Sequence, residues 1–429
     1  ATVDMHDRLG ALGLAAVLVV ERDCAVPEGP AIVKVPDTRR ALAPLSAAAL
    51  GNPGRDLCVV AVTGTNGKTS TTFIVEAMGR AAGLRTGVIG TTGHRVDGEV
   101  IPSSHTTPSA PVTQALLARM RDRGVQLVAM EASSIGLAAH RCDAIPFRAA
   151  AFTNLSRDHL DVHGTMEAYA AAKARLFLEL LEGVAVLNAR DPVSPSMVPP
   201  RHPTWWFHGP DLRADRIEYR ATGTSAQFHT PSGACAGQSR LLGAHNVDNT
   251  LAALGLALAA GVPLEACLEG LAALPAIPGR LEPVPNDRGL AVLVDYAHTD
   301  DALASVLATL RSVAEGRIIT VFGCGGDRDR GKRPLMGRAA AAGSDVVVVT
   351  TDNPRGEDPA AIVADILPGL FGAQYEVVID RAEAIARAVA LARPGDVILV
   401  AGKGHEPYQD VGGVRLPFDD RAVARAALA

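Results

Sequence analysis

Residues 57–80 place a glycine-rich loop between an apolar run and a helix-compatible stretch. The run Leu-Cys-Val-Val leads into A-V-T-G-T-N-G-K-T-S at 61–70, and residues 71–80 suit a helix. A strand, such a loop and a helix in succession form a phosphate-binding unit of parallel α/β sheets. The backbone N–H groups of the turn and of the helix start attract an anion. The loop therefore predicts a chain that binds ATP.

The loop is a short variant of this motif. A longer spacing has glycine where this chain has Val62, which leaves G-T-N-G-K-T. Lys68 can reach the terminal phosphates and the Thr69 hydroxyl can bind Mg²⁺. A plain glycine turn would not explain Lys-Thr at the junction of strand and helix. The candidate ATP contacts here are Gly64, Thr65, Asn66, Gly67, Lys68, Thr69 and Ser70.

Composition fits an α/β protein of several domains. At 429 residues the chain is too long for one ordinary core, and 48% hydrophobic with 20% charged residues is typical of globular proteins. The net charge of −5 gives no electrostatic footprint for nucleic acid. We find no stretch long enough to span a membrane, no signal-peptide pattern and no C-x-x-C pair among the six cysteines. We expect a cytoplasmic monomer.

Short β-branched runs alternate with Ala- and Leu-rich stretches, the pattern of parallel sheets with crossover helices. Strands are predicted near residues 57–62, 87–89, 127–131, 149–153, 184–188, 291–295, 318–322, 346–350, 376–379 and 397–401, and helices over 166–181 and 245–260. The three prolines of 276–285 suit an interdomain connection. We predict an α/β fold of three domains: a small N-terminal segment (1–56), a central ATP-binding domain (57–280) and a doubly wound C-terminal domain (281–429).

Polar residues follow two central strands, at the edge where open α/β sheets bind ligands. Glu131 ends one strand and is a candidate Mg²⁺ ligand, although the adjacent Ser133 equally suits a helix cap. The next strand leads into T-N-L-S-R-D-H-L-D-V-H at 153–163. This segment favours a second Mg²⁺ contacted by His159, with two aspartates orienting the loop, and leaves a zinc site as the alternative.

Further polar candidates lie near the predicted hinge. Asn246 and Asn249 open a predicted helix, where they could pair with an adenine edge or cap the helix. Asp295 at a strand end could accept hydrogen bonds from ribose hydroxyls, and Arg280 could reach a phosphate.

Three charged segments follow strands of the last domain. They are G-C-G-G-D-R-D-R-G-K-R at 323–333, D-N-P-R at 352–355 and G-K-G-H-E at 402–406. Because they lie at the same edge of one sheet, they can converge on one ligand. Arg328 and Arg355 offer forks for carboxylates and Glu406 offers a partner for an ammonium group, which suits an amino acid with an extra carboxylate. Solvated surface loops are the alternative.

In order along the chain, these motifs resemble those of the Mur ligases of bacterial cell-wall synthesis. The resemblance covers about residue 30 to the end, through T-G-T-N-G-K-T, H-T-T-P-S, E-A-S-S-I-G-L, F-T-N-L-S-R-D-H-L-D-V-H-G-T, A-A-K-A-R-L-F, G-A-H-N-V-D-N, P-G-R-L-E, D-Y-A-H-T-D-D-A-L, G-C-G-G-D-R-D-R-G-K-R, D-N-P-R and G-K-G-H-E. It implies an N-terminal domain for UDP, here partial, a central P-loop domain and a Rossmann-like C-terminal domain. It also implies an ATP-dependent ligase that joins an amino acid to a carboxylate through an acyl phosphate in peptidoglycan precursor synthesis.

The resemblance also implies roles for single residues. Lys173, by composition only a solvated helix charge, matches a lysine that the family carbamylates. Catalytic positions are then Lys68, Glu131, His159 and Lys173, and the residues holding two Mg²⁺ ions are Thr69, Glu131, His159 and the Lys173 carbamate. Muramoyl-peptide contacts are Thr106, Thr107, Ser133 and Arg141; ATP-side contacts are Asn246, Asn249, Arg280 and Asp295; amino-acid contacts are Arg328, Asp352, Asn353, Arg355, Gly402 and Glu406.

Within the family, D-N-P-R goes with addition of meso-diaminopimelate to UDP-MurNAc-L-Ala-D-Glu. The alternatives are the same reaction with L-lysine or L-ornithine, a ligase like folylpolyglutamate synthetase, and a non-catalytic homologue. The chain departs from the family at Ala139, where Gln is frequent, and at Asp300, where Pro is usual. The segment before Lys68 is short, so uridine contacts are not assigned.

Overall fold

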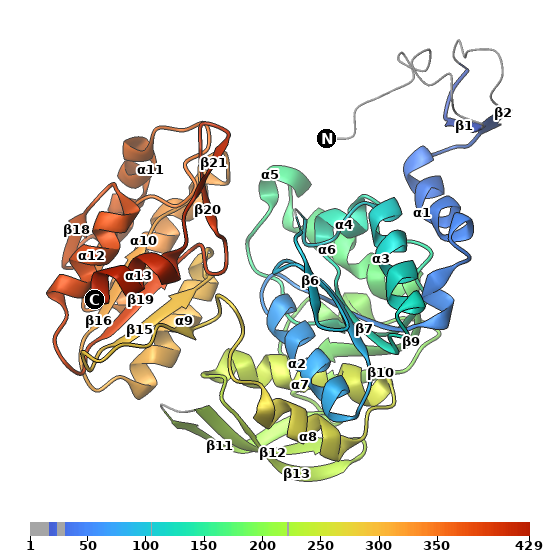
Figure 1. The fold of residues 1–429 in the computed structure, drawn as a ribbon, viewed down its shortest axis with the longest axis horizontal. Helices are drawn as coiled ribbons and strands as arrows, with labels where there is room; N and C mark the ends of the chain where they lie inside the picture. Colours follow the sequence, from blue (N-terminus) through green and yellow to red (C-terminus); the bar gives the residue numbers. More distant parts are fainter. Residues whose placement is uncertain (1–16, 24–30, 104, 221–222) are drawn as a thin grey trace.

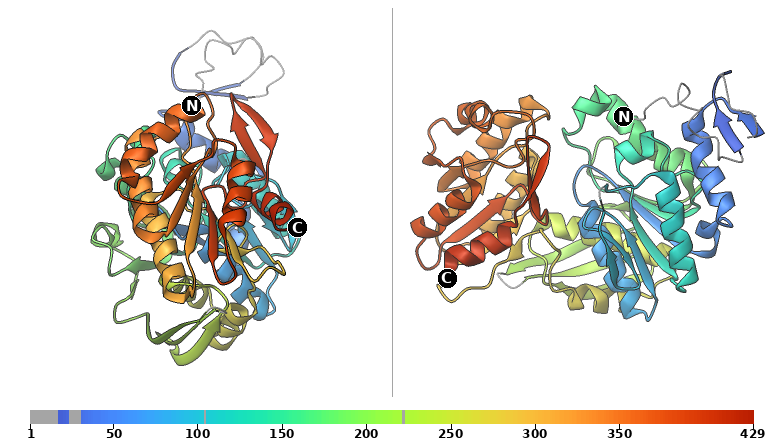
Figure 2. Two further views of the ribbon diagram at one scale, coloured as in Figure 1. Left: turned by 90° about the vertical axis from the view of Figure 1, so that its left-hand side faces the viewer. Right: turned by 45° about the horizontal axis from the view of Figure 1, so that its top comes forward.

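A computed structural model describes residues 17–23, 31–103, 105–220 and 223–429. Two large α/β bodies lie side by side, and a small N-terminal unit extends from the central one (Figure 1). In this unit β1 (Val17–Val20) pairs in parallel with β2 (Ala31–Lys34), and α1 (Thr38–Ala49) packs on the central body. The described part of this segment thus holds a pair of strands and a helix, and residues 1–16 and 24–30 lie outside it. Figure 2 shows the N-terminal unit at the end of the central body away from the C-terminal one.

An eight-stranded sheet forms the central body, in the order β10-β9-β8-β3-β7-β4-β5-β6. The first six of these strands run parallel, and β5 and β6 add an antiparallel edge. The strands are β3 (Cys58–Thr63), β4 (Thr86–Ile89), β5 (His94–Val96), β6 (Glu99–Ile101), β7 (Leu127–Glu131), β8 (Phe147–Phe152), β9 (Leu181–Asn188) and β10 (Thr204–Phe207).

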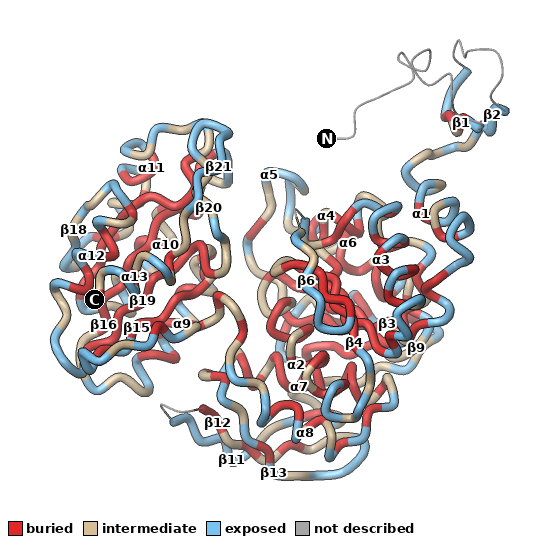
Figure 3. Tube along the Cα trace, viewed as in Figure 1, coloured by how far each residue is buried: buried red, intermediate tan, exposed pale blue. Residues whose placement is uncertain are grey.

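Helices cover both faces of this sheet. Its inner strands are almost continuously apolar because each face packs against a helical layer. One layer contains α2 (Lys68–Ala81), α7 (Ala244–Ala259) and α8 (Leu264–Ala273); the other contains α3 (Ala110–Asp122), α4 (Ser134–Ala138) and α6 (Met166–Arg175). The short α5 (Leu160–His163) follows β8. Figure 3 shows the buried residues concentrated in the strands and inner helix faces of both bodies.

The C-terminal body has a six-stranded sheet in the order β14-β15-β19-β16-β17-β18. Its strands are β14 (Glu282–Pro283), β15 (Ala291–Asp295), β16 (Ile318–Phe322), β17 (Val346–Val349), β18 (Tyr375–Val377) and β19 (Val397–Ala401). On one face pack α9 (Asp300–Val313), α10 (Arg333–Gly343) and α11 (Pro359–Ile366), and on the other α12 (Arg381–Leu391) and α13 (Asp420–Leu428). All neighbours except β14 are parallel, which confirms the predicted doubly wound sheet.

Besides the antiparallel edge strands β5, β6 and β14, two antiparallel elements have no counterpart among the predicted strands. One is a sheet of β11 (Arg213–Arg220), β12 (Gly223–Thr230) and β13 (Gly233–Ser239), which packs on α8. The other is the hairpin of β20 (Tyr408–Val411) and β21 (Val414–Pro417). Strand β11 is mostly exposed and charged along its length, so the alternation that marks a half-buried strand is missing.

Some predicted boundaries are wrong. The predicted helix over 166–181 ends at Arg175, continues as a π-helical turn over Leu176–Leu180 and gives way to β9. Neither glycine nor proline occurs between Arg175 and Leu181 to predict this change from the sequence. The turn is held instead by core packing of its buried residues Leu176 and Phe177. Strand β18 ends at Val377, two residues before its predicted end. Among the described helices, none has the length and apolar character needed to cross a membrane.

Candidate active site

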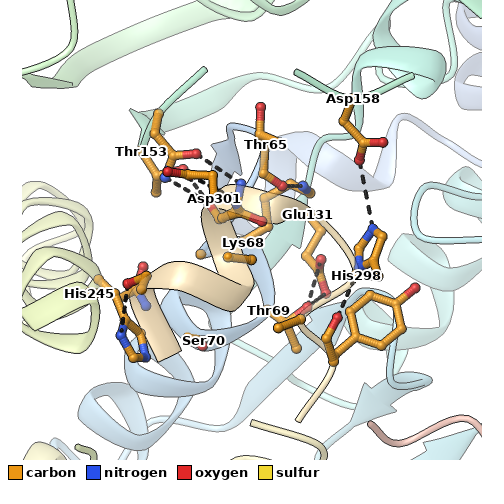
Figure 4. Close-up of a pocket in the computed structure, with 18 of the residues that line it drawn as sticks. Thr65, Lys68, Thr69, Ser70, Glu131, Thr153, Asp158, His245, His298 and Asp301 are labelled. Carbon is orange, nitrogen blue, oxygen red and sulfur yellow. Dashed lines mark hydrogen bonds and ion pairs between the residues drawn. The ribbon is translucent and has the colours of Figure 1, made fainter. Parts of the chain in front are cut away.

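A cavity of about 430 Å³ lies where β3, β7 and β8 end, between the central and C-terminal bodies (Figure 4). The phosphate loop and Glu131 line it from the central side, and His298 and Asp301 line it from the C-terminal side. The site therefore combines groups from both bodies, as expected for ligands that bind at the carboxyl edge of an open α/β sheet.

The phosphate loop is shaped by two glycines in the left-handed half of φ space. Gly64 has φ +151°, and a Cβ there would lie 1.9 Å from the Thr153 hydroxyl oxygen. Gly67 has φ +90°, and a Cβ there would lie 2.3 Å from Asn249 Oδ1. Gly67 precedes α2 without a side-chain cap, so the first N–H groups of the helix are left for an anion.

The end of β8 holds the loop in place. The Asn66 N–H donates to Asn154 Oδ1 (3.0 Å), and the Thr153 hydroxyl donates to the Asn66 carbonyl (2.6 Å). Sequence analysis did not single out Thr153 and Asn154, although they open the polar run after that strand. Their position immediately after a predicted strand was the available signal.

Two lysines converge on one carbonyl of the loop. Lys68 Nζ donates to the carbonyls of Gly64 (2.9 Å) and Thr65 (2.8 Å), and Lys173 Nζ donates to the same Gly64 carbonyl (2.7 Å). Burial lowers the pKa of both amines. The neighbouring Lys68 charge lowers the pKa of Lys173 further, well below its usual range. Lys173 is thus a buried amine biased toward its neutral form, not a solvated helix charge.

Glu131 is held from two sides. Its carboxylate accepts hydrogen bonds from the Thr69 hydroxyl (3.1 and 3.0 Å), the Thr91 N–H (2.8 Å) and the Thr91 hydroxyl (3.0 Å). The Glu131 side chain is buried in the cavity wall. The Thr69 hydroxyl and this carboxylate are the hard oxygen donors that suit Mg²⁺ together with phosphate oxygens.

Asp158 and His159 lie at the interface between the two bodies. Asp158 lies 3.7 Å from His298 Nε2 and 3.7 Å from Lys332 Nζ, both from the C-terminal body. Burial would raise the pKa of Asp158, but nearby His298 first, and then His159 and Lys332, outweigh it and hold the pKa far below its usual range. Burial lowers the pKa of His159 to about 4, which keeps the imidazole neutral and fit to bind a metal.

The zinc alternative has no geometric support in the described part of the chain. No three His, Cys, Asp or Glu side chains gather there as a closed zinc site requires. The Thr69 and Glu131 oxygens suit a harder cation.

The predicted muramoyl-peptide contacts form one network beside Glu131. The Thr107 hydroxyl donates to the Glu131 carbonyl (2.8 Å) and lies 2.9 Å from the Ser133 hydroxyl. Arg141 donates to the Thr107 carbonyl (2.8 Å), and the Thr106 hydroxyl lies 2.9 Å from that of Thr91. Thr106 and Ser133 line the cavity, whereas Thr107 and Arg141 support it from behind.

The ATP-side candidates divide into two groups. Arg280 donates to the Thr69 hydroxyl (3.2 Å), and Asp295 accepts the N–H groups of Leu281 and Ala297 (2.7 Å each). Arg280, Asp295 and Asn249 line the cavity. Asn246 does not, because its amide donates to the Leu242 carbonyl (2.8 Å) at the start of α7. The capping alternative is not borne out either, because Gly243 precedes α7 without a side-chain cap and Asn246 Oδ1 accepts from the Asn249 amide (3.1 Å).

The predicted amino-acid contacts gather in a separate place, at the carboxyl ends of β16, β17 and β19. Asn353 donates to Glu406 (2.9 Å), and buried Lys403 donates to both Asn353 (3.0 Å) and Glu406 (3.2 Å). Arg355 donates to the Gly326 carbonyl (2.7 Å). Lys403 is not among the predicted site residues, although it lies inside the G-K-G-H-E motif.

Two further amino-acid candidates border this cluster, and one reaches across the interface. Gly402 has φ +117°, and a Cβ there would lie 2.5 Å from Asp352 Oδ2. Arg328 extends toward the central body and lies 3.7 Å from Asp161. Among the described residues that line the cavity, none belongs to the six predicted amino-acid contacts.

Comparison with known proteins places the chain in a family. Residues 62–257 match the Mur ligase middle domain, and residues 279–404 match the Mur ligase glutamate ligase domain. The chain belongs to the Mur ligase family. As a Mur ligase it has an α/β fold of three domains and forms amide bonds at the expense of ATP.

Individual relatives of this Mur ligase match over most of its length. The UDP-N-acetylmuramoyl-L-alanyl-D-glutamate–2,6-diaminopimelate ligase of Geobacter metallireducens is 45% identical over 96% of this chain and 86% of its own. A solved structure of an enzyme of that name has a TM-score of 0.68 and 37% identity, over 96% of this chain and 86% of that one. Folylpolyglutamate synthase of Mycobacterium tuberculosis, complexed with ADP and AMPPCP, shares the fold, with a TM-score of 0.72 and 23% identity over 85% of this chain and 92% of that one.

Proposed function

We propose that this Mur ligase adds meso-diaminopimelate to UDP-MurNAc-L-Ala-D-Glu in peptidoglycan precursor synthesis. The observation that carries the choice of amino acid is the position of Arg355. It lies two residues after Asn353, whose side chain binds Glu406 and Lys403, and its own guanidinium donates to the Gly326 carbonyl, which follows strand β16. A guanidinium fork there suits a second carboxylate on the incoming amino acid, while Glu406 suits its ammonium group. Relatives that match nearly the whole chain carry this activity in their names.

The reaction takes two steps. The D-Glu carboxylate oxygen attacks the γ-phosphorus of ATP, so that an acyl phosphate forms and ADP leaves. The amine of the amino acid then attacks the acyl carbon, loses a proton, and inorganic phosphate leaves as the amide forms. Lys68 balances negative charge on the phosphoryl group, and the cavity between the two bodies excludes water from the acyl phosphate.

The residues around the loop fit two Mg²⁺ ions. Thr69 and Glu131 would hold the first, and His159 with Lys173, as its carbamate, would hold the second. When bound, the ions supply positive charge against the phosphate oxygens. The neutral amine that burial favours at Lys173 is the form that reacts with carbon dioxide, which supports carbamylation there. The other predicted ATP, muramoyl-peptide and amino-acid contacts belong to the same proposal, with Asn246 acting through Asn249, whose amide donates to its Oδ1 (3.1 Å).

The proposal also includes the organisation of the chain. We assign residues 1–56, 57–280 and 281–429 to the N-terminal, central and C-terminal domains, and we infer a cytoplasmic monomer. Strand β14 joins the C-terminal sheet two residues after Arg280, which supports a hinge at that residue.

One assay tests the function. ADP release is measured with UDP-MurNAc-L-Ala-D-Glu and meso-diaminopimelate, L-lysine or L-ornithine, and with a folate plus L-glutamate as a fourth arm. We expect release with meso-diaminopimelate only. Equal release with L-lysine would remove the role given to Arg355. Release in the folate arm alone, or in none, would contradict the proposed reaction.

A further inference from the structure

The hairpin of β20 and β21 contacts the D-N-P-R segment at 352–355. It lies on the side of the C-terminal body that faces the central body (Figure 1). Its outer strand β21 is exposed at all four residues, and the tip at Gly412 and Gly413 is exposed as well. Because an isolated two-stranded hairpin is at best marginally stable in water, its conformation depends on the contacts that it makes with the rest of the body.

Gln409 on β20 holds the start of the D-N-P-R segment. Its side-chain amide nitrogen donates to the Thr351 hydroxyl (3.0 Å) and to the Asp352 carbonyl (2.7 Å). The amide thus spans the last residue before the segment and the first residue within it. Deeper in the body, the Thr351 carbonyl accepts a hydrogen bond from buried Arg381 (3.0 Å). The start of the segment is therefore fixed both from the core and from the hairpin.

The residues after Gln409 bind the remainder of the segment. The Asp410 N–H donates to Asn353 Oδ1 (2.9 Å), and the Asp410 carbonyl accepts the Arg355 N–H (2.9 Å). The Gly412 N–H then donates to the Arg355 carbonyl (2.7 Å), and Arg355 forms a parallel bridge with Val411. Both backbone groups of Arg355 are thus bonded to the hairpin.

These contacts hold Arg355 in an uncommon backbone conformation. Its φ is +51°, in the left-handed region that favours glycine. A residue with a large side chain stays there only when its surroundings fix it, as the two backbone hydrogen bonds do here. The backbone conformation limits the side-chain rotamers, and the guanidinium lies where it donates to the Gly326 carbonyl (2.7 Å). The hairpin therefore influences where the Arg355 fork points.

We propose that Gln409 is a positioning residue for the incoming amino acid, which seats β20 on the D-N-P-R segment and so fixes the direction of the Arg355 guanidinium. The inference rests on the proposed function, in which Arg355 binds the second carboxylate of meso-diaminopimelate. It gives a part in amino-acid selection to a residue outside the three charged segments, and that residue acts through Arg355.

A matched pair of variants separates this role from a general effect on the fold. Gln409→Met keeps a neutral side chain of similar length and removes both donated hydrogen bonds. Gln238→Met, at an exposed glutamine of β13, is the control. The KM values for meso-diaminopimelate and ATP are measured for both variants, for Arg355→Ala and for the double variant Gln409→Met/Arg355→Ala. Hydrogen exchange of the full chain without substrates, followed by mass spectrometry on peptides covering residues 352–356, measures local opening of the segment.

We expect Gln409→Met to raise the KM for meso-diaminopimelate by about tenfold, the size expected for the loss of two neutral hydrogen bonds, and to leave the KM for ATP unchanged. Exchange at residues 352–356 should become faster, whereas Gln238→Met should resemble the wild type in every measurement. In the Arg355→Ala background, Gln409→Met should add little, because the effects of residues that act as a unit are not additive.

Exchange at the wild-type rate in Gln409→Met, or an equally large rise in KM in the Arg355→Ala background, would overturn the inference. A parallel rise in the KM for ATP would overturn it as well, since it would indicate a general effect on the fold. If the wild type does not use meso-diaminopimelate, the proposed function fails, yet the exchange comparison still decides whether Gln409 holds the segment.

Discussion

The phosphate site of the central body and the amino-acid cluster of the C-terminal body are built in different ways. In the first, backbone geometry at Gly64 and Gly67 shapes the loop, and the first N–H groups of α2 are left without a side-chain cap. In the second, Asn353 and Glu406 already satisfy each other through side-chain hydrogen bonds. Uncapped backbone N–H groups can receive a phosphate without giving up a side-chain partner, whereas an amino acid must exchange existing side-chain hydrogen bonds for its own. Catalytic power should therefore reside in the first region and selectivity in the second.

The largest expected effect on activity tests whether catalytic power resides in the phosphate site. Lys68→Ala removes the buried cation that faces the phosphates, and we expect kcat to fall by about 10³-fold. ADP release should fall equally with every amino acid tested, since the phosphoryl step precedes amide formation. Lys34→Ala, at an exposed lysine paired with Asp23, is the control. A loss that depended on the amino acid would break the division between the two regions.

Lys173→Ala should be the next most damaging change. Loss of the carbamate weakens the second metal position, and we expect activity to fall by about 10²-fold. Added acetate should restore part of the rate by supplying a carboxylate in the vacated space. Lys173→Arg, which keeps the cation but forms no carbamate, should stay inactive with acetate. A fully active Lys173→Ala enzyme would contradict carbamylation.

Arg355→Ala tests whether the amino-acid cluster of the C-terminal body sets selectivity. A charge-assisted hydrogen bond to a carboxylate contributes about 1.5–3 kcal/mol, so the KM for meso-diaminopimelate should rise about tenfold to 10²-fold. Steady-state kinetics should show an unchanged KM for ATP and no loss of any residual rate with L-lysine. Arg415→Ala, on hairpin strand β21, is the control. A raised KM for ATP would show that the two regions are not separable.

The smallest expected effect is on the free energy of unfolding, through the ion pairs of Glu357 with the loop that carries Arg328. Glu357 accepts hydrogen bonds from Arg333 (2.7 and 3.1 Å), the Asp327 N–H (2.6 Å) and Arg330 (2.7 Å), with Arg333 as the first cause of a pKa lowered to about 2. A lowered pKa stabilises the fold above the ordinary value of 4.5, and this contribution is lost as the pH falls from 4.5 through 2.

Glu357→Gln should accordingly flatten the pH dependence of the free energy of unfolding between pH 4.5 and 2. At neutral pH the free energy of unfolding should fall by less than about 1 kcal/mol, since water screens a partly solvated ion-pair cluster. Urea unfolding at several pH values measures both quantities. An unchanged slope between pH 4.5 and 2 would mean that the cluster does not stabilise the loop.

Sequence patterns were most informative at strand ends. The phosphate loop, Glu131 and the D-N-P-R segment could be located because each follows a short apolar run, and parallel strands bring such ends to one edge. The sheet of β11–β13 could not, since its mostly exposed first strand lacks alternation. The orientation of Asn246 was equally hidden, because an asparagine at a helix start suits a ligand contact and a local hydrogen bond alike.

The sequence by itself determined the local chemistry. It supplies glycines where positive φ is needed, Lys68 and Thr69 at the helix start, and the guanidinium group of Arg355 after a strand of the C-terminal body. Only the tertiary structure decided which of these groups meet. It brought Lys173 to the Gly64 carbonyl and Arg280 to Thr69. The physical reason is that conformational preferences act within a few residues, whereas these contacts depend on how helices pack on the sheet and how one body docks on the other.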